Sequence, residues 1–426
     1  MNIIISTAGT WGDVLPYISI GTALRKRGHN VVLLANSKFE AEIRKAELGF
    51  HSVSSKEDFE NALSYIVNEG LIWEQGAAKN ANLKKVIESL GKLFLNSTRP
   101  IYEYIYNNCQ PGNTLLINNY ICYGARYAQD KLNIPGITVV LVPFYFHSKY
   151  RPAQQPNLPE WMPRFVKRFW RSFFEDFILF KPLFEQFHDG DIELSKYKEY
   201  KLRFSPDKVI CMTPEWFAKP QPDWPPQTEV LGFPIYEGEQ TQKLPREVEE
   251  YIAEGEPPII FNPGSQLQEN DKFFIESAYA CEKLKKRGIF VGCYDKKVPK
   301  NLPSCVKVFR YIPLDTILPR AAAMVYHGGI GTCSQGLRAG IPHLVVPTFP
   351  EHYDTAYRLK ELGVGDTINW SKYNAQDIAN KLDKLINSSV VAKNCREITC
   401  KFDCSDPIDD FCNIVEKLAR KHGILK

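Results

Sequence analysis

The chain has 426 residues, of which 44% are hydrophobic and 24% are charged, and its formal net charge is +4 at pH 7. This length exceeds what one hydrophobic core usually supports and predicts two domains. So small a net charge argues against nucleic acid as a partner. Eleven cysteines without a CxxC pair predict free thiols in a reducing compartment. Because the longest apolar stretch, 137–146, is too short to cross a bilayer, the sequence predicts a cytoplasmic protein.

The first 55 residues alternate short β-branched runs with helical patterns. The predicted strands are NIIIS, HNVVLLA and FHSVS, and the helical patterns between them are LPYISIGTALRKRG and EAEIRKAELG. This βαβ order predicts a parallel sheet. Further strands are predicted at 114–118, 137–142 and 208–212. We expect these elements to form a first domain over residues 1–235.

Aromatic and basic residues crowd together in an insertion at about 144–224, which contains WMPRFVKRFWRSFFEDFILF. One interpretation is an amphipathic helix pair that packs on the first domain. The other is an interfacial face, which predicts peripheral contact with the inner membrane surface. In that case the aromatic side chains that enter the lipid would be Trp161, Phe165, Trp170 and Phe174. The side chains that meet anionic headgroups would be Arg164, Lys167 and Arg168.

A polar, proline-bearing segment at 236–257 predicts a linker. A second βαβ series follows, and its strands are predicted at 259–262, 289–293, 306–309, 322–326 and 343–347. We expect a second domain over 258–390 and a C-terminal helix within 391–426 that crosses back to the first domain. The predicted fold class is α/β, with two Rossmann-like doubly wound domains facing a central cleft.

The segment Tyr326-His327-Gly328-Gly329-Ile330-Gly331-Thr332 follows a predicted strand and opens a predicted helix. Glycines allow close approach of an anion, and the helix start presents unpaired N–H groups. The loop therefore predicts a diphosphate site in the second domain. A tight strand-to-helix turn without a ligand is the other interpretation.

A longer block, HGGIGTCSQGLRAGIPHLVVP followed by PEHYDTAYRLKELGVG, resembles the donor-binding signature of inverting GT-B glycosyltransferases of the plant and macrolide type. The opening segment GTWGDVLPYISIGTALRKRGHNVVLLA resembles the start of the same family. Residues 216–234, with Pro303-Ser304 and Leu318-Pro319, are similar to the B-subunit rhamnosyltransferases of rhamnolipid synthesis. The resemblance implies a GT-B fold, in which the first domain binds the acceptor and the second binds the nucleotide-diphosphate sugar. It also implies an inverting hexosyltransferase that needs no metal and no cofactor apart from this co-substrate.

The implied reaction moves a hexose from a UDP- or dTDP-sugar to a hydroxyl of a lipophilic small molecule. Rhamnosyl transfer of the rhamnolipid type is the first choice, and UDP-glucose-dependent glucosylation of a sterol, terpenoid or lipid is the alternative. A different class of protein is a catalytically inactive nucleotide-binding activator. Such proteins tend to lose their phosphate-binding residues, whereas this chain retains them, which favours an enzyme.

The resemblance also implies donor-binding residues. They are Thr10, Gly12, Ser265, Tyr311, Ile312, His327, Gly329, Gly331, Thr332, Gln335, Glu351 and His352. Tyr311 is expected beside the base, and His327 at the α-phosphate. Gln335 stands where a ribose-binding Glu is frequent, and Glu351 and His352 stand where the family usually has an Asp-Gln pair for sugar hydroxyls. The identity of the sugar therefore stays open.

Asp13, in Gly12-Asp13-Val14-Leu15-Pro16, is the expected general base, because a carboxylate at the cleft can take the proton of the attacking hydroxyl. An Asp before Val-Leu-Pro is also a good helix N-cap, and this is the alternative. A general base works best with a pKa near the working pH, so the site should be partly desolvated or the proton should leave late. Asp189-Gly190-Asp191 mimics a DxD metal motif but follows a helical pattern, so no metal is expected.

Overall fold

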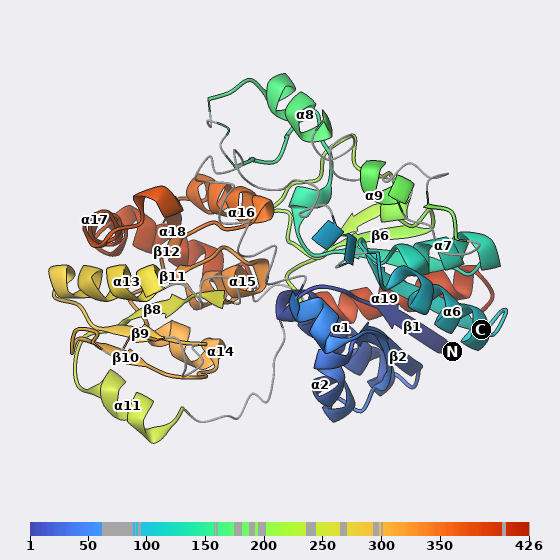
Figure 1. The fold of residues 1–426 in the computed structure, drawn as a ribbon, viewed down its shortest axis with the longest axis horizontal. Helices are drawn as coiled ribbons and strands as arrows, with labels where there is room; N and C mark the ends of the chain where they lie inside the picture. The colour runs from blue at the N-terminus through green and yellow to red at the C-terminus, as the bar shows by residue number, and fades with distance from the viewer. Residues whose placement is uncertain are drawn as a thin grey trace.

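The fold was described from a computed structural model. The structure describes residues 1–61, 95–156, 161–173, 202–235, 244–264, 271–292, 301–402 and 406–425, with the short pieces 88–89, 91–92, 158, 181–186, 192–194 and 298–299. Two α/β lobes lie side by side, with the N-terminal elements in one lobe and most of the C-terminal half in the other (Figure 1). Ser265, Phe174 and Asp189-Gly190-Asp191 lie outside the described residues.

The first lobe is built on a seven-stranded parallel sheet with strand order β3-β2-β1-β4-β5-β6-β7. Its strands are β1 (Asn2–Ser6), β2 (Asn30–Asn36), β3 (Gly49–Ser54), β4 (Thr114–Asn119), β5 (Gly136–Val140), β6 (Lys208–Cys211) and β7 (Thr228–Val230). The helices of this part of the chain are α1 (Trp11–Lys26), α2 (Glu40–Lys45), α6 (Thr98–Asn108), α7 (Tyr123–Leu132), α8 (Arg164–Ser172) and α9 (Lys181–Gln186). The outward order from β1 is that of a doubly wound Rossmann sheet.

The second lobe repeats this plan with a six-stranded parallel sheet of order β10-β9-β8-β11-β12-β13. Its strands are β8 (Ile259–Asn262), β9 (Gly288–Phe290), β10 (Val306–Val308), β11 (Ala323–Tyr326), β12 (His343–Val345) and β13 (Gly365–Thr367). Its helices are α11 (Arg246–Ala253), α13 (Asp271–Leu284), α14 (Leu314–Ile317), α15 (Ile330–Ala339), α16 (Pro350–Glu361), α17 (Ala375–Ile386) and α18 (Ser389–Thr399). The predicted fold of two doubly wound sheets is confirmed.

Strand prediction succeeded wherever the strand is buried. Every strand expected from a β-branched run is present, with ends shifted by a few residues. The two strands that were missed, β7 and β13, are three-residue edge strands with the sequences TEV and GDT. Because an edge strand of this length packs few apolar side chains, it leaves no hydrophobic period in the sequence.

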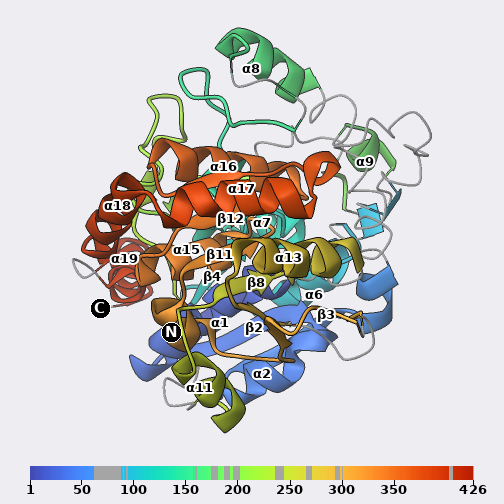
Figure 2. The ribbon, with the colours of Figure 1, turned by 90° about the vertical axis from the view of Figure 1, so that its left-hand side faces the viewer.

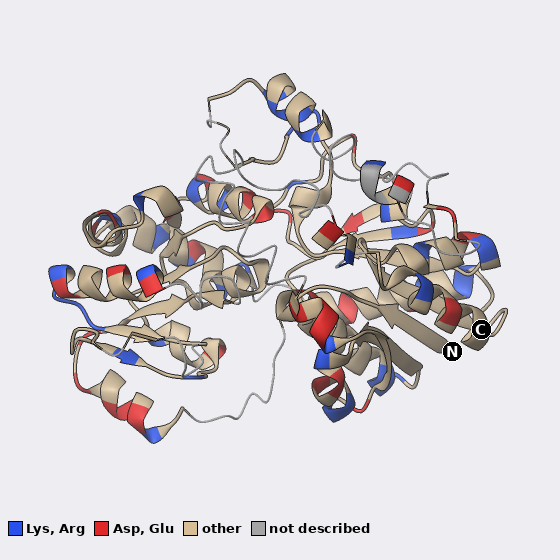
Figure 3. Ribbon diagram, in the orientation of Figure 1, with Lys and Arg blue, Asp and Glu red and all other residues tan. Residues whose placement is uncertain are grey.

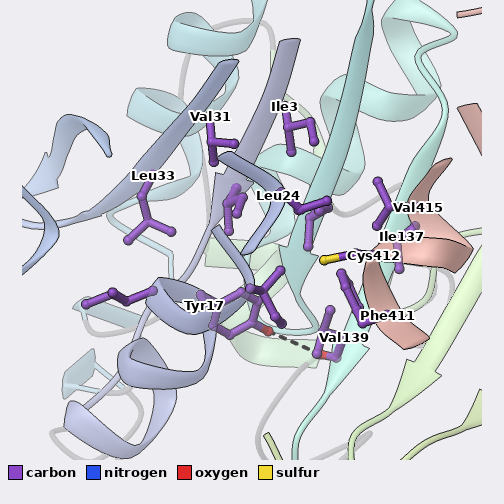
Figure 4. Packing of buried hydrophobic residues seen from close by; sticks show 14 of the residues in the cluster. Ile3, Tyr17, Leu24, Val31, Leu33, Ile137, Val139, Phe411, Cys412 and Val415 are labelled. Atoms are coloured by element: carbon purple, nitrogen blue, oxygen red, sulfur yellow. Dashed lines mark hydrogen bonds between the residues drawn. The ribbon is translucent and has the colours of Figure 1, made fainter. Parts of the chain in front are cut away.

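The C-terminal helix α19 (Pro407–Lys421) packs against α1 in the first lobe. Phe411, Cys412 and Val415 of α19 join the core formed by the first sheet and α1 (Figure 4). The hydroxyl of Tyr17 on α1 donates a hydrogen bond to the carbonyl of Val139 on β5 at 3.4 Å inside this core. The first lobe therefore contains both the first and the last helix of the chain.

Helix α16 of the second lobe contains a buried ion pair, and both of its members form hydrogen bonds to the first part of the chain. Arg358 Nε lies 2.7 Å from Asp354 Oδ2, and both side chains are almost fully buried. Asp354 Oδ1 accepts a hydrogen bond from the backbone N–H of Gln154 at 3.0 Å, and Arg358 Nη1 donates one to the carbonyl of Phe217 at 3.1 Å. Phe217 itself packs in the core of the second lobe.

Helix α8 lies at the top of the molecule, apart from both sheets, in two perpendicular views (Figures 1 and 2). Its aromatic side chains are exposed, and so is Trp161 just before it, whereas Lys167 is buried. The expectation of a helix pair with its aromatic side packed on the first domain is therefore wrong for α8. The expectation that Lys167 meets lipid headgroups is also wrong. Among the described residues, no helix is both long and apolar enough to span a bilayer.

Candidate active site

In a doubly wound sheet, ligands bind beyond the carboxyl ends of the strands, where the strand order reverses. The order reverses between β1 and β4 in the first lobe and between β8 and β11 in the second. Tyr120, Gly264 and His327 lie in the loops that follow β4, β8 and β11, and Asp13 lies in the first turn of α1, the helix that follows β1. The topology therefore brings the predicted general base and the predicted phosphate loop to the carboxyl ends of the two sheets.

Asp13 lies in the first turn of α1 and is not its N-cap. The N-cap is Thr10, and Asp13 Oδ2 accepts a hydrogen bond from the backbone N–H of Thr10 at 2.8 Å and one from Thr10 Oγ1 at 3.3 Å. The alternative of an N-cap Asp is thus corrected: the carboxylate satisfies a backbone donor from inside the helix. Gly9 has a φ of +119°, and a Cβ there would lie 2.3 Å from Asp13 Oδ2, so the approach of this carboxylate needs glycine.

The carboxyl group of Asp13 lies among many protein atoms although it is partly accessible to solvent. This desolvation raises the pKa of Asp13 from its usual value near 4 to about 6, against the opposing hydrogen bonds from Thr10. The partial desolvation expected from the sequence is present in the structure. A carboxyl group with this pKa is mostly ionised at neutral pH and can accept a proton without being a very weak base.

Glu351, in the first turn of α16 of the second lobe, is close enough to Asp13 of the first lobe to interact with it electrostatically. Burial and, to a smaller extent, the negative charge of Asp13 raise the pKa of Glu351 to about 7. Two aromatic residues are close enough to interact electrostatically with both carboxyl groups, Tyr120 after β4 and Tyr145 after β5. Their rings pack with centroids 4.1 Å apart. The sequence analysis missed both tyrosines, although the position of Tyr120 at the switch point could have indicated it.

His327, directly after β11, is held between two glycines. A Cβ at Gly264 would lie 2.4 Å from His327 Cε1, and a Cβ at Gly329 would lie 2.5 Å from His327 Nε2. No other residue fits at either position without displacing the ring. Burial lowers the pKa of His327 to about 4, against a smaller opposing effect of the backbone of Asn262. At neutral pH the ring is uncharged and offers a ligand a hydrogen bond but no positive charge.

The N-terminus of α15 adds backbone donors beside this ring. Its N-cap is Gly329, no side chain caps the helix, and its first turn has no acidic residue. A Cβ at Gly331 would meet no atom within 4 Å, so open space lies over this turn. Thr332 and Gln335 follow on the same helix and are partly exposed. These features suit an anion at the helix N-terminus.

His352 is buried and turned toward its own helix. Its Nδ1 accepts a hydrogen bond from the backbone N–H of Phe349 at 3.1 Å and lies 3.1 Å from Thr348 Oγ1. Because Nδ1 is an acceptor, the proton of this neutral ring is on Nε2, which lies 3.9 Å from Glu351 Oε1. The rings of His352 and His327 pack edge to face, 5.0 Å apart. Nε2 is the atom of His352 left to meet a sugar.

The remaining predicted donor residues differ in their exposure to solvent. Tyr311, in the loop before α14, is 67% exposed, as a ring that stacks on a nucleotide base would be. The neighbouring side chain of Ile312 is buried in the core of the second lobe, so only its backbone can meet a nucleotide. Gly12 is exposed in the first turn of α1, next to Asp13. Ser265 follows Gly264 but lies outside the described residues.

Comparison with known families agrees with this division into two lobes. Residues 3–150 match the glycosyltransferase family 28 N-terminal domain, and residues 291–416 match the C-terminal domain of erythromycin biosynthesis protein CIII-like proteins. The first match contains Asp13, and the second contains His327 and Glu351.

Solved glycosyltransferases have the same overall structure. The glycotransferase of kitacinnamycin is 18% identical, with a TM-score of 0.70 over 98% of this chain and 99% of that one. The glycosyltransferase VinC, solved in complex with dTDP, is 16% identical, with a TM-score of 0.66 over 99% and 100%. The chain has the GT-B fold.

Two curated relatives resemble the chain over almost its whole length. A sterol 3-beta-glucosyltransferase from Eremothecium gossypii is 24% identical over 411 residues, which are 91% of this chain and 32% of that protein. The O-mycaminosyltylonolide 6-deoxyallosyltransferase of Streptomyces fradiae is 22% identical over 98% of both chains. The GT-B chain thus spans about a third of the length of the fungal relative and nearly all of the bacterial one.

Proposed function

We propose that the chain is a glycosyltransferase that moves a sugar from a nucleotide-diphosphate donor to a hydroxyl of a lipophilic acceptor. The observation that carries the proposal is the position of Asp13 at the carboxyl end of the first sheet, within electrostatic range of Glu351. Glu351 belongs to the second lobe, which also contains His327 and the uncapped start of α15. This arrangement provides a base on one side and an anion site on the other. The glycosyltransferases with the same fold support it.

In the proposed reaction, Asp13 takes the proton of the acceptor hydroxyl while its oxygen bonds to the anomeric carbon of the sugar. The bond from that carbon to the diphosphate oxygen breaks, and the electron pair leaves with the nucleotide diphosphate. Because the acceptor attacks the face opposite to the leaving group, the configuration inverts. His327 and the N–H groups of α15 stabilise the departing diphosphate, so the scheme uses no metal.

Glucose transfer to a sterol, terpenoid or other lipid is the preferred form of the proposal. The sterol 3-beta-glucosyltransferases of Eremothecium gossypii, at 24% identity, and of Arabidopsis thaliana, at 25% identity, support it. Both of these names specify glucose, so glucose replaces rhamnose as the first choice of sugar. UDP as the nucleotide, and the donor residues already named, belong to the same proposal.

A donor panel tests the proposal. The full chain is incubated with one donor, which is UDP-glucose, UDP-galactose or dTDP-rhamnose, and one acceptor, which is a sterol, a fatty alcohol or a water-soluble phenol. The products are identified and quantified by mass spectrometry. We expect UDP-glucose with a lipophilic alcohol to give the most product. If UDP binds but no donor yields a product, the chain is a nucleotide-binding activator and not a transferase.

A further inference from the structure

Helix α8 exposes its aromatic side chains to solvent and buries two of its basic ones, which is the reverse of an ordinary surface helix. The exposed fractions of its apolar side are 74% for Phe165, 70% for Phe169 and 51% for Trp170, with 44% for Phe173 and 81% for Trp161 beside it. We call these five residues the aromatic face. An ordinary surface helix turns such a face toward the core and its charges toward water. An exposed face of five large aromatic residues is typical of an interaction surface.

Two of the basic residues of α8, Lys167 and Arg171, lie on the side that packs against the protein. Lys167 Nζ donates a hydrogen bond to Gln154 Oε1 at 2.9 Å, and the Arg171 guanidinium lies over the ring of Phe144, 4.3 Å from its centroid. Lys167 and Arg171 are both almost fully buried. These contacts hold the helix in its orientation, so the aromatic face points outward because its opposite side is anchored.

A pocket of about 180 Å³ lies under α8, next to the aromatic face. Lys149, Arg168 and Arg171 line it, together with Asp223, whose Oδ2 already accepts the backbone N–H of Lys149 at 2.7 Å. Residues 161–173 contain four basic residues and no acidic one, and the ribbon of α8 in Figure 3 has blue positions but no red one. Two of these basic residues, Arg164 and Arg168, are exposed, and their charge is complementary to an anionic surface.

We infer that the aromatic face docks on a membrane that contains anionic phospholipids, with headgroup phosphates in the basic pocket. Trp and Phe are the residues that favour the boundary between headgroups and acyl chains, and flanking Lys and Arg side chains add attraction to anionic lipid. The inference rests on the proposed function for its purpose, since a lipophilic acceptor would be present in such a membrane.

The anchoring contacts also connect this surface to the candidate site. Gln154, which accepts from Lys167 of α8, donates its backbone N–H to Asp354 of α16. Helix α16 carries Glu351 in its first turn. Two hydrogen bonds through Gln154 therefore connect the docking surface to α16, the helix that contains Glu351. When the protein is docked, these contacts keep the candidate site in a fixed orientation to the membrane.

Vesicle flotation of the full chain tests the inference. One set of vesicles contains phosphatidylcholine alone, and the other contains phosphatidylcholine with phosphatidylglycerol. We expect the wild type to float with the anionic vesicles, and less so at high salt. The triple variant Phe165→Ser, Phe169→Ser, Trp170→Ser should bind them at least tenfold more weakly. The control, Tyr106→Ser with Val390→Ser, removes similarly exposed apolar side chains from α6 and α18 and should float like the wild type.

A second pair of substitutions tests the pocket. Lys149→Gln with Arg168→Gln should weaken binding to anionic vesicles by about fivefold for each charge removed, and should not change binding to phosphatidylcholine alone. A wild type that does not float with anionic vesicles overturns the inference, and so does a triple aromatic variant that floats equally well. If that variant instead converts a dimer to a monomer in sedimentation, the aromatic face is a contact between copies of this chain.

The activity readout separates this inference from the proposed function. With a water-soluble phenol as acceptor, all variants should transfer sugar at the wild-type rate, because none of the substituted residues belongs to the candidate site. Transfer without flotation overturns the docking surface and leaves the proposed function standing. Flotation that follows the expected pattern in a chain that transfers no sugar supports docking and overturns the proposed function.

Discussion

At the scale of single residues, the carboxyl groups of Asp13 and Glu351 interact with each other, and they have different pKa values. Burial raises the pKa of Asp13 to about 6 and that of Glu351 to about 7, and the charge of Asp13 contributes to the second value. Asp13 therefore loses its proton first, and between the two pKa values it is the more ionised member of the pair. This order favours Asp13 over Glu351 as the proposed base.

We expect Asp13→Asn to slow sugar transfer by about 100- to 10,000-fold, which is about 3–5 kcal/mol in the activation barrier. The amide keeps the shape of the side chain and can still accept the hydrogen bond from Thr10, so the Kd for UDP should not change. Steady-state kinetics and calorimetry measure the two quantities. Transfer at the wild-type rate would leave Asp13 with a role in the α1 turn only.

The pH dependence distinguishes the two carboxyl groups. Because the base must be ionised, kcat/KM should fall about tenfold per pH unit below about pH 6, which is the pKa of Asp13 in the protein without substrate. Glu351→Gln should leave this acid limb in place, because Glu351 is still protonated when Asp13 ionises. The matched control is Glu361→Gln at the exposed end of α16. A limb near pH 7 that disappears in Glu351→Gln would make Glu351 the base.

We expect His327→Ala to weaken UDP binding by about 1.5–3 kcal/mol, the usual range for a lost hydrogen bond to a charged group. The pKa of His327 is lowered to about 4, so the ring is already neutral at pH 5 and above. Its contribution to binding should therefore be constant between pH 5.5 and about 8. Calorimetry at several pH values tests this, with the exposed His51→Ala as a control. An unchanged Kd in His327→Ala contradicts the assignment.

At the scale of elements, the buried Asp354–Arg358 pair of α16 forms hydrogen bonds to the backbone of Gln154 and of Phe217. Asp354→Asn leaves the Arg358 charge buried without its partner, and we expect a loss of about 3–5 kcal/mol in unfolding free energy. Urea unfolding followed by fluorescence measures it. The control Arg151→Gln breaks the exposed ion pair with Glu361 on the same helix and should cost about 0–1 kcal/mol. Equal effects would show that the buried pair is not special.

At the scale of the whole molecule, each lobe takes part of its core from outside its own half of the chain. Helix α19 packs in the first lobe, and Phe217 and Phe233 pack in the second. Both core clusters of the second lobe are formed by residues within 217–398, including Phe217, Phe233 and Ile398. A fragment of residues 213–402 should therefore fold and bind UDP or dTDP by calorimetry. A fragment of residues 255–386 lacks these three side chains and should not fold. A folded 213–402 fragment without nucleotide affinity would contradict the placement of the donor site.

The fold was predictable because buried parallel strands leave short β-branched apolar runs, and the glycine loop at His327 is what led us to expect the donor in the second lobe. The pairing of Asp13 with Glu351 was not predictable, since it depends on how the two lobes meet and no local pattern records that. The inward turn of His352 was missed for a related reason: capping by a histidine at the third helical position has no common sequence signature. For α8, composition indicated the aromatic and basic character, but only the structure assigned each to a side.

The position of α19 in the core of the first lobe has a consequence for biosynthesis. Residues 407–421 are translated about 400 residues after β1, a delay of roughly 20 to 80 seconds at about 5–20 residues per second. During that interval the ribosome-bound first lobe exposes the apolar side chains that Phe411 and Val415 later cover. Most of the second lobe is translated after most of the first, but its last buried core residue, Ile398, precedes α19. The core of the second lobe can therefore be complete before that of the first. The nascent first lobe is therefore the part of the chain that most needs a chaperone.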